Sequence, residues 1–195
     1  MKKGIKALGM NMEAIKGNCM VYELNIEYIY CGDVICKCSG YHYFESIRDV
    51  MTLYNISVAR LFECELNGDK YDHYDTVHCT NKIKLIREIS KEEITKYIED
   101  NLDELVNDKD WYVRLEIARL RYSLDKLVND EEYEVRREVA KQGYGLDKLI
   151  NDKHWYVRCE VAKQGYGLDK LINDKDKYVR LEALNQLELR KNKEN

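Results

Sequence analysis

Four side chains that can bind a metal lie within twelve residues of the N-terminal half: Cys31, Cys36, Cys38 and His42. A structural zinc ion needs four such sulfur and nitrogen ligands in a tetrahedral arrangement. Their spacing, Cys-x4-Cys-x-Cys-x3-His, differs from standard zinc spacings, and cysteine is often just a small buried apolar residue. We therefore interpret these cysteines as core residues and predict no metal and no cofactor, with zinc as the alternative.

An aromatic segment, Gly40-Tyr41-His42-Tyr43-Phe44, precedes a predicted helix that ends near Tyr54. It resembles the Gly-x-Tyr-Phe…Tyr element of ADP-ribosyltransferases, in which aromatic rings hold nicotinamide. The resemblance implies a nucleotide site at His42, Tyr43 and Tyr54. Candidates for the catalytic glutamate are Glu63 and Glu65. The alternative is that His42 is a hydrogen-bonded packing residue.

No other constellation in the sequence indicates catalysis. There is no arguable Ser/His/Asp set, no pair of metal-binding carboxylates and no phosphate-binding glycine loop. We therefore assign no catalytic residue, and we favour a protein that is not an enzyme.

The C-terminal half repeats an aspartate followed six residues later by an arginine. The four pairs are Asp108/Arg114, Asp130/Arg136, Asp152/Arg158 and Asp174/Arg180. The pattern resembles the second helix of HEAT repeats, and its short period resembles the bacterial leucine-rich-repeat variant and HEAT-like phage repeats. The resemblance implies a structural ladder in which aspartate and arginine pair between neighbouring repeats. A ladder that binds phosphate groups is the alternative.

These pairs belong to four tandem segments of 22 residues: 102–123, 124–145, 146–167 and 168–189. Each predicts a short helix, an Asn-Asp break and a longer second helix with one apolar face. We expect the aspartate to be the N-cap of the second helix, and Gly143 and Gly165 to end it in the left-handed conformation. Such copies stack because none can bury its apolar face alone. We therefore predict an all-α solenoid over 102–189, followed by a tail over 190–195.

Two columns of side chains could form a binding surface on this stack. The aromatic column lies at the start of the second helices and consists of Trp111, Tyr112, Tyr133, Trp155, Tyr156 and Tyr178. Aromatic residues often anchor interfaces, although the tryptophans could instead fill the grooves between repeats. The basic column consists of Arg119, Lys141 and Lys163, and it is also typical of a solvated helix face.

Residues 1–89 show no repeat and predict a small α+β domain. Apolar and polar residues alternate over 21–30, 58–66 and 82–89, which indicates strands. A further strand over 40–44 and a helix from Ser46 complete a strand–strand–helix–strand–strand order. Residues 90–101 predict a connecting helix that begins with a Ser90–Glu93 capping box. The predicted fold class is α+β, a small N-terminal α+β domain followed by the solenoid.

The N-terminal region also resembles an uncharacterised domain found in many phage and prophage proteins. The matching segments, in order, are residues 3–7, 38–44, 49–50, 54, 62–65 and 80–84. The resemblance implies a phage or prophage origin. That family has no established activity, so it transfers no catalytic residues.

Charge is nearly balanced, with 13 Lys/Arg and 16 Asp/Glu in residues 1–101, and 16 and 19 in residues 102–189. A nucleic-acid-binding domain is usually more basic. No segment approaches the ~20 apolar residues of a membrane span. With no recognisable secretory signal and an odd number of cysteines, we expect a cytoplasmic location, in the host cell if the protein is phage-encoded.

We predict a protein that binds a host or phage protein, such as an inhibitor of host defence of the anti-CRISPR kind. The alternatives are an ADP-ribosyltransferase-like or nucleotide-binding enzyme in the N-terminal domain, and nucleic-acid binding by the solenoid.

Overall fold

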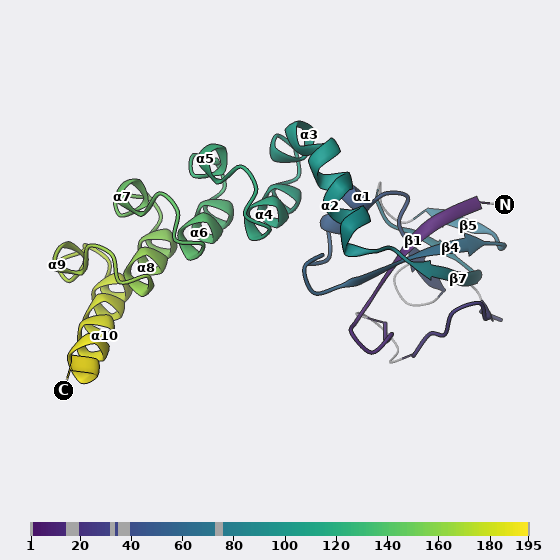
Figure 1. Ribbon diagram of the computed structural model, residues 1–195, viewed down its shortest axis with the longest axis horizontal. Helices are drawn as coiled ribbons and strands as arrows, with labels where there is room; N and C mark the ends of the chain where they lie inside the picture. The colour runs from purple at the N-terminus through teal and green to yellow at the C-terminus, as the bar shows by residue number, and fades with distance from the viewer. Residues whose placement is uncertain (1, 15–19, 32–33, 35–39, 73–75, 195) are drawn as a thin grey trace. The chain divides into compact units, whose positions relative to one another are not determined.

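The computed structural model describes residues 2–14, 20–31, 34, 40–72 and 76–194. The chain divides into two compact units, Met1–Leu105 and Val106–Asn195. Antiparallel strands dominate the first unit and helices form the second, as Figure 1 shows. The predicted mixture of α and β structure is therefore confirmed.

The first unit contains two antiparallel sheets. The larger has the order β1 (Lys2–Leu8), β4 (Arg60–Leu66), β7 (Lys82–Glu88) and β2 (Glu27–Ile29). The smaller has the order β3 (Tyr41–Tyr43), β6 (His78–Thr80) and β5 (Lys70–Asp72). Backbone hydrogen bonds in both directions between Ile5 and Phe44, at 2.7 and 2.8 Å, join β1 to the end of β3. The two sheets thereby share one apolar core, which includes Leu8, Tyr43, Phe62, Ile83 and Leu85.

The sequence pattern predicted some of these strands and missed others. The strand expected over 21–30 is confined to Glu27–Ile29, because Asn25 adopts a left-handed conformation with φ of 63°. The Asn25 N–H then donates to the carbonyl of Leu85 at 2.8 Å. β1, β5 and β6 were not predicted. β1 lacks a clean alternation since it buries a lysine, Lys6.

Two capped helices complete the first unit. α1 (Ile47–Met51) begins at Ser46, whose Oγ accepts the N–H of Asp49 at 3.1 Å. α2 (Lys91–Asp100) begins with the predicted Ser90–Glu93 capping box, which is confirmed.

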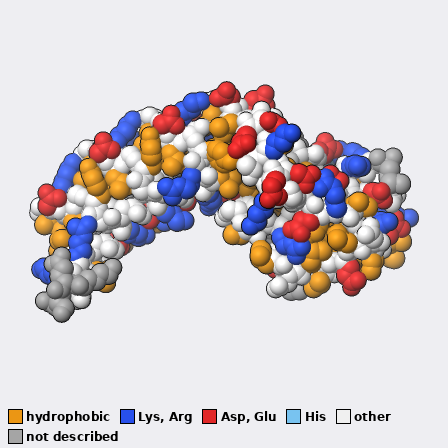
Figure 2. Space-filling model, viewed as in Figure 1, with side chains coloured by type: hydrophobic (Ala, Val, Ile, Leu, Met, Phe, Trp, Pro, Cys, Tyr) orange, Lys and Arg blue, Asp and Glu red, His pale blue; other side chains and the backbone are white. Residues whose placement is uncertain are grey.

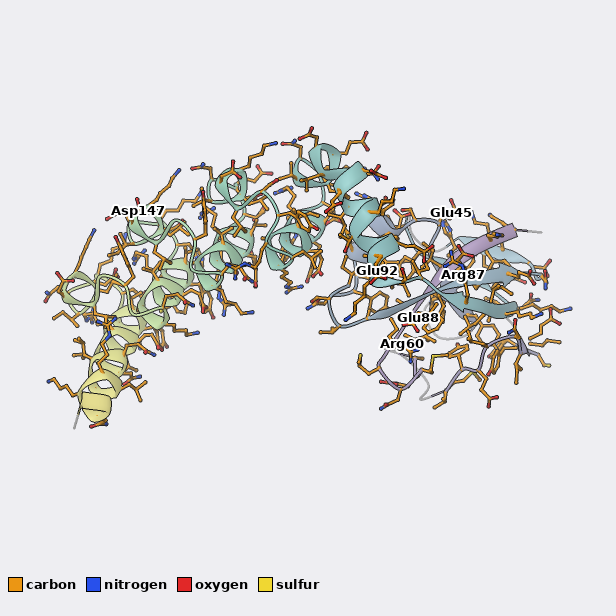
Figure 3. The ribbon with its side chains drawn as sticks, viewed as in Figure 1. Glu45, Arg60, Arg87, Glu88, Glu92 and Asp147 are labelled. Atoms are coloured by element: carbon orange, nitrogen blue, oxygen red, sulfur yellow. The ribbon has the colours of Figure 1, made fainter. Side chains whose placement is uncertain are left out.

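Ion pairs connect the strands of the larger sheet to each other and to α2. Arg87 donates to Glu93 of α2 at 2.8 and 2.9 Å and to Glu63 of β4 at 2.6 Å. Arg60 and Glu88 form a second, bidentate pair between β4 and β7, at 2.6 and 2.8 Å (Figure 3).

The helices from Leu102 onward alternate between short and longer ones. The short, first helices are α3 (Leu102–Val106), α5 (Leu124–Leu127), α7 (Leu146–Leu149) and α9 (Leu168–Leu171). The longer, second helices are α4 (Trp111–Arg119), α6 (Tyr133–Lys141), α8 (Trp155–Lys163) and α10 (Lys177–Glu194). Each second helix begins 22 residues after the one before it and contacts it along its length. Figure 1 shows the second helices lying side by side, with the short helices along one side of them.

Small and branched apolar side chains allow the second helices to pack closely. Val135, Val139 and Ala140 of α6 are fully buried, as are their counterparts Val157, Val161 and Ala162 of α8. Gly143 ends α6 in the left-handed conformation, with φ of 76°, and its N–H donates to the carbonyl of Ala140 at 2.9 Å. Gly165 repeats this conformation after α8. The predicted left-handed helix ends are therefore confirmed.

The predicted N-caps are wrong by two residues. The second helices begin after Asp110, Glu132 and His154 rather than after Asp108, Asp130 and Asp152. The ladder aspartates instead accept the backbone N–H two residues later, as Asp130 does from Glu132 at 2.9 Å. An arginine of the preceding copy also binds the carboxylates of Asp130, Asp152 and Asp174.

Candidate interaction surface on the helical unit

Buried arginine–aspartate pairs link consecutive copies. Arg114, Arg136 and Arg158 bind Asp130, Asp152 and Asp174, each through Nε and Nη2 at 2.6–2.9 Å. The third nitrogen, Nη1, donates to a carbonyl of the arginine's own copy, such as Asp108 O at 2.7 Å from Arg114. Each arginine is about 5% exposed. The guanidinium donors of these three arginines are buried and already hydrogen-bonded. They therefore have no free pair of N–H groups that could bind a phosphate.

The electrostatics of the ladder follow from this geometry. Hydrogen bonding to aspartate raises the pKa of Arg114, Arg136 and Arg158 above the usual value. Burial alone would raise the pKa of Asp152, but the hydrogen bonds from Arg136 and from the His154 N–H bring it below its usual value. The three arginine–aspartate pairs connect consecutive copies at a fixed repeat of 22 residues.

A second column of acids, absent from the candidates chosen by sequence, lies along the second helices. Glu116, Glu138 and Glu160 are 1–8% exposed. They recur at the 22-residue period, two residues after each ladder arginine, and this periodicity is the signal that could have revealed them.

These glutamates neutralise the predicted basic column. Arg119 bonds to Glu116 and lies 3.9 Å from Glu138. Lys141 lies 3.5 Å from Glu138, and Lys163 lies 3.6 Å from Glu160. Because a carboxylate accompanies each cation, this column makes a charge-balanced face rather than a basic stripe.

The aromatic residues at the helix starts form a continuous stack from α6 to α10. The Tyr133 and His154 rings lie 3.7 Å apart at 16°, and those of Trp155 and Tyr156 lie 3.7 Å apart at 25°. His154 lies 5.7 Å from Tyr156, and Trp155 lies 5.2 Å from Tyr178. We call these five residues the aromatic stack. Trp111 and Tyr112 stack on each other at 4.0 Å.

The outer members of these stacks remain open to solvent. Tyr112, Tyr156 and Tyr178 are 44%, 42% and 51% exposed, whereas Trp111, Tyr133 and Trp155 are half-buried. Hydrophobic side chains recur along the visible face of the helical unit, with charged side chains along its edges (Figure 2). The half-buried tryptophans therefore stack against exposed tyrosines, as Trp155 does on Tyr156.

His154 is the member of the stack that sequence reasoning missed. It precedes α8 at a position where the other copies carry acidic residues, Asp110, Glu132 and Asp176. Its Nδ1 atom is buried and meets no hydrogen-bond partner among the described residues. The His154 ring stacks on Tyr133. The third copy therefore has an aromatic contact at the position where the other copies have an acidic side chain.

A groove of about 550 Å³ opens beside the aromatic stack, between α8 and α10. Its lining includes Trp155, Tyr156, Tyr178, Leu181, Arg137 and Lys163. Arg137 lies over the Tyr156 ring at 5.6 Å and pairs with Glu160 at 3.2 Å. The groove thus combines aromatic walls with charged side chains of both signs, since Glu182 also lines it and Glu160 pairs with Arg137 and Lys163. This chemistry suits an apolar side chain.

The structure places the N-terminal candidates within or against the apolar core. Tyr43 is 1% exposed, with its ring 5.4 Å from that of His78. Tyr54 meets Phe44 edge-on at 5.7 Å, and burial raises its pKa. The backbone carbonyl of His42 accepts a hydrogen bond from Lys6 Nζ at 2.8 Å. Stacking a nicotinamide on Tyr43 would require this core to open.

The remaining polar groups of this core are also enclosed. Burial lowers the pKa of Lys6 to about 8 and raises that of Cys64 to about 12. Cys36 and Cys38 of the predicted cysteine cluster lie outside the described residues, and Cys31 is exposed. Among the described residues, no group of histidine, cysteine and acidic side chains could hold a metal ion.

Comparison of the chain with protein-family models, curated proteins and solved structures gave no match. Within the described part of the chain, every helix is too short or too polar to cross a bilayer.

Proposed function

We propose that residues 102–189 form a short HEAT-like α-solenoid, and that its aromatic stack and the adjoining groove bind a segment of another protein. The observation that carries the proposal is the continuous stack from Tyr133 to Tyr178, which leaves two tyrosines more than 40% exposed above a groove. Rigid, pre-ordered aromatic side chains lose little entropy on binding, and such residues commonly carry most of the binding energy of an interface.

The regular stacking of copies supports the solenoid part of the proposal. The second helices recur every 22 residues, each contacts the next, and three identical arginine–aspartate pairs connect them. Repeat arrays of this kind are quasi-one-dimensional, and they present extended surfaces to their partners.

The charge arrangement favours a protein over a nucleic acid as the partner. Nucleic-acid affinity comes largely from cations that displace counterions from phosphates. Here the ladder arginines are buried against aspartates, and Glu116, Glu138 and Glu160 accompany the basic column. Arg137 and Lys163 of the groove both pair with Glu160 as well. We take the partner to be a host or phage protein that places an apolar side chain in the groove.

A matched pair of double variants tests this proposal with the full-length protein. Tyr156→Ala/Tyr178→Ala removes the exposed rings of the stack. Tyr144→Ala/Tyr166→Ala removes two tyrosines of similar exposure, 42% each, which follow the ends of the second helices. Tagged proteins are incubated with nuclease-treated bacterial lysate, after circular dichroism has shown equal helicity.

We expect the unsubstituted protein and the Tyr144/Tyr166 variant to retain one host protein stoichiometrically. The Tyr156/Tyr178 variant should retain at least about tenfold less of it, as loss of interface anchors predicts. Equal retention by both variants would contradict the proposal. So would binding to a single-stranded oligonucleotide that weakens steeply with salt, because that result indicates phosphate contacts.

A further inference from the structure

At one repeat position, the last helix, α10, exposes a side chain that every earlier second helix buries. Ala118, Ala140 and Ala162 occupy one repeat position in α4, α6 and α8, and each is 0% exposed. Leu184 occupies this position in α10 and is 49% exposed. The repeat–repeat interface therefore continues onto α10, where nothing among the described residues covers it.

The adjacent repeat position varies in burial. Leu115 and Cys159 are 6% and 9% exposed, whereas Arg137 of α6 is exposed and Leu181 of α10 is 56% exposed. Leu189, two turns further along α10, is 51% exposed. With 3.6 residues per turn, Arg180, Leu181, Leu184 and Glu188 fall within about 100° of one another around α10, whereas Leu189 lies on another side of the helix. We call the surface of Arg180, Leu181, Leu184 and Glu188 the terminal face.

The arginine ladder also stops at this face. Arg180 Nη1 donates to Asp174 O at 2.7 Å and to Lys175 O at 3.0 Å, as Arg136 does to Asp130 O and Glu131 O. In the earlier copies Nε and Nη2 bind an aspartate sixteen residues later. For Arg180, no carboxylate among the described residues binds Nε or Nη2. These two nitrogens are therefore available to an acceptor on another molecule.

No further copy covers the terminal face within the described chain. Gly165 ends α8 in the left-handed conformation, and the next short helix follows it. At the corresponding positions Leu187-Glu188-Leu189, α10 continues as a helix to Glu194. The extension adds Glu188 to the face instead of turning back to cover it.

We propose that the terminal face binds the same face of a second copy of this chain, with the two α10 helices antiparallel about a two-fold axis at Leu184. The face is self-complementary in this register. Arg180 lies four residues before Leu184 and Glu188 lies four residues after it. An antiparallel pair therefore places each Arg180 at the level of Glu188 of the partner subunit, twice per dimer.

The charges of the face favour a second copy over an unrelated helix. Glu188 is exposed and has no partner among the described residues, and the open nitrogens of Arg180 need a carboxylate. In the same register Lys177 lies level with the partner's Lys191, at the outer ends of the contact. Lys177 Nζ lies 4.9 Å from the centre of the Tyr178 ring, so this lysine makes a cation–π contact within its own chain.

Sedimentation equilibrium of the full-length protein tests the contact. We expect a reversible monomer–dimer equilibrium in the micromolar range. Leu184→Asp should raise the dimer dissociation constant by at least about tenfold, since it places an unpaired charge at the axis. The control Leu53→Asp replaces a leucine of the first unit that is 43% exposed, and it should leave the constant unchanged.

A charge exchange tests the register. Arg180→Glu and Glu188→Arg should each weaken the dimer, and the double variant Arg180→Glu/Glu188→Arg should restore it. A protein that stays monomeric, a dimer insensitive to Leu184→Asp, or a double variant weaker than both single variants would overturn the proposal. The proposal would also be overturned if the protein were monomeric and Leu184→Asp abolished its binding to a lysate protein. That result would assign the terminal face to a different partner. Tyr156→Ala should leave dimerisation intact, which separates this test from that of the aromatic stack.

Discussion

Arg136 binds Asp152 with both arms of its guanidinium group, at 2.6 Å from Nε to Oδ2 and 2.9 Å from Nη2 to Oδ1. The two residues belong to consecutive copies, and their side chains are about 6% exposed. The same contact recurs between Arg114 and Asp130 and between Arg158 and Asp174. One charged pair per interface therefore connects the copies of the helical unit.

Removing one partner of this pair should destabilise the helical unit strongly. We expect Arg136→Ala to lower the free energy of unfolding by about 3–5 kcal/mol, because it leaves the Asp152 carboxylate buried without its counterion. Within one chain, Arg180→Ala removes only hydrogen bonds to carbonyl groups. At protein concentrations far below the dimer dissociation constant it should therefore cost about 1 kcal/mol. Both tryptophans of the chain lie in this unit, so urea unfolding followed by tryptophan fluorescence measures the difference. Equal losses would show that the ion pair adds nothing.

The ladder should also make the helical unit sensitive to acid. The folded-state pKa values of Asp152 and Asp174 lie below the usual 3.8, because arginine and backbone hydrogen bonds outweigh burial. The stability that this shift contributes is fully present above the unfolded pKa of 3.8, and it is lost as pH falls through the lower folded values. Urea midpoints should therefore fall below about pH 4. Asp152→Asn should start less stable and show a shallower decline; an identical slope would contradict this assignment.

His154 should be replaceable by phenylalanine with a gain in stability. The substitution keeps the stacking on Tyr133 and removes the buried, unpartnered Nδ1 atom. We expect His154→Phe to raise the free energy of unfolding by about 1 kcal/mol, and His154→Ala to lower it by about the same amount through the lost ring contact. Thermal and urea unfolding check both. A destabilised phenylalanine variant would mean that Nδ1 has a role that the stack does not explain.

Two glycines should differ in their tolerance of alanine. Gly143 and Gly145 both have positive φ, at 76° and 62°, so alanine costs about 1 kcal/mol of strain at either. A Cβ atom at Gly143 meets open space, whereas at Gly145 it would lie 2.6 Å from Val128 Cγ2. Gly145→Ala should therefore cost roughly 1–3 kcal/mol more than Gly143→Ala in equilibrium unfolding. Equal costs would show that Val128 can move aside freely.

The first unit should not bind NAD. Tyr43, the ring that would hold nicotinamide by analogy with ADP-ribosyltransferases, is 1% exposed in the core. We expect titration calorimetry with millimolar NAD to show no binding heat for the full-length protein. Binding that His42→Ala or Tyr54→Ala abolishes, in a variant with unchanged circular dichroism, would contradict the core interpretation and revive an enzymatic one.

Local patterns in the sequence determined the repeating elements of this protein. The 22-residue period, the left-handed glycines Gly143 and Gly165, and the Ser90–Glu93 capping box depend on residues close in sequence. Backbone sterics and helix-end hydrogen bonds act over a few residues, so composition and spacing suffice to predict them. The alternation over 58–66 and 82–89 predicted β4 and β7 for the same reason.

Only the tertiary structure decided what the side chains of those elements contact. Asp152 looked like a helix cap, but an arginine sixteen residues earlier turns its carboxylate toward the preceding copy. His154 joins the aromatic stack, and Glu160 meets Arg137, because neighbouring helices bring residues about twenty positions apart together. Likewise, Tyr43 is buried because residues of β1 and β6 pack against its ring, Gly4 on one strand and His78 on the other. Spacing along one chain sets a residue's face on its own helix or strand, whereas contacts and burial depend on which element packs against that face.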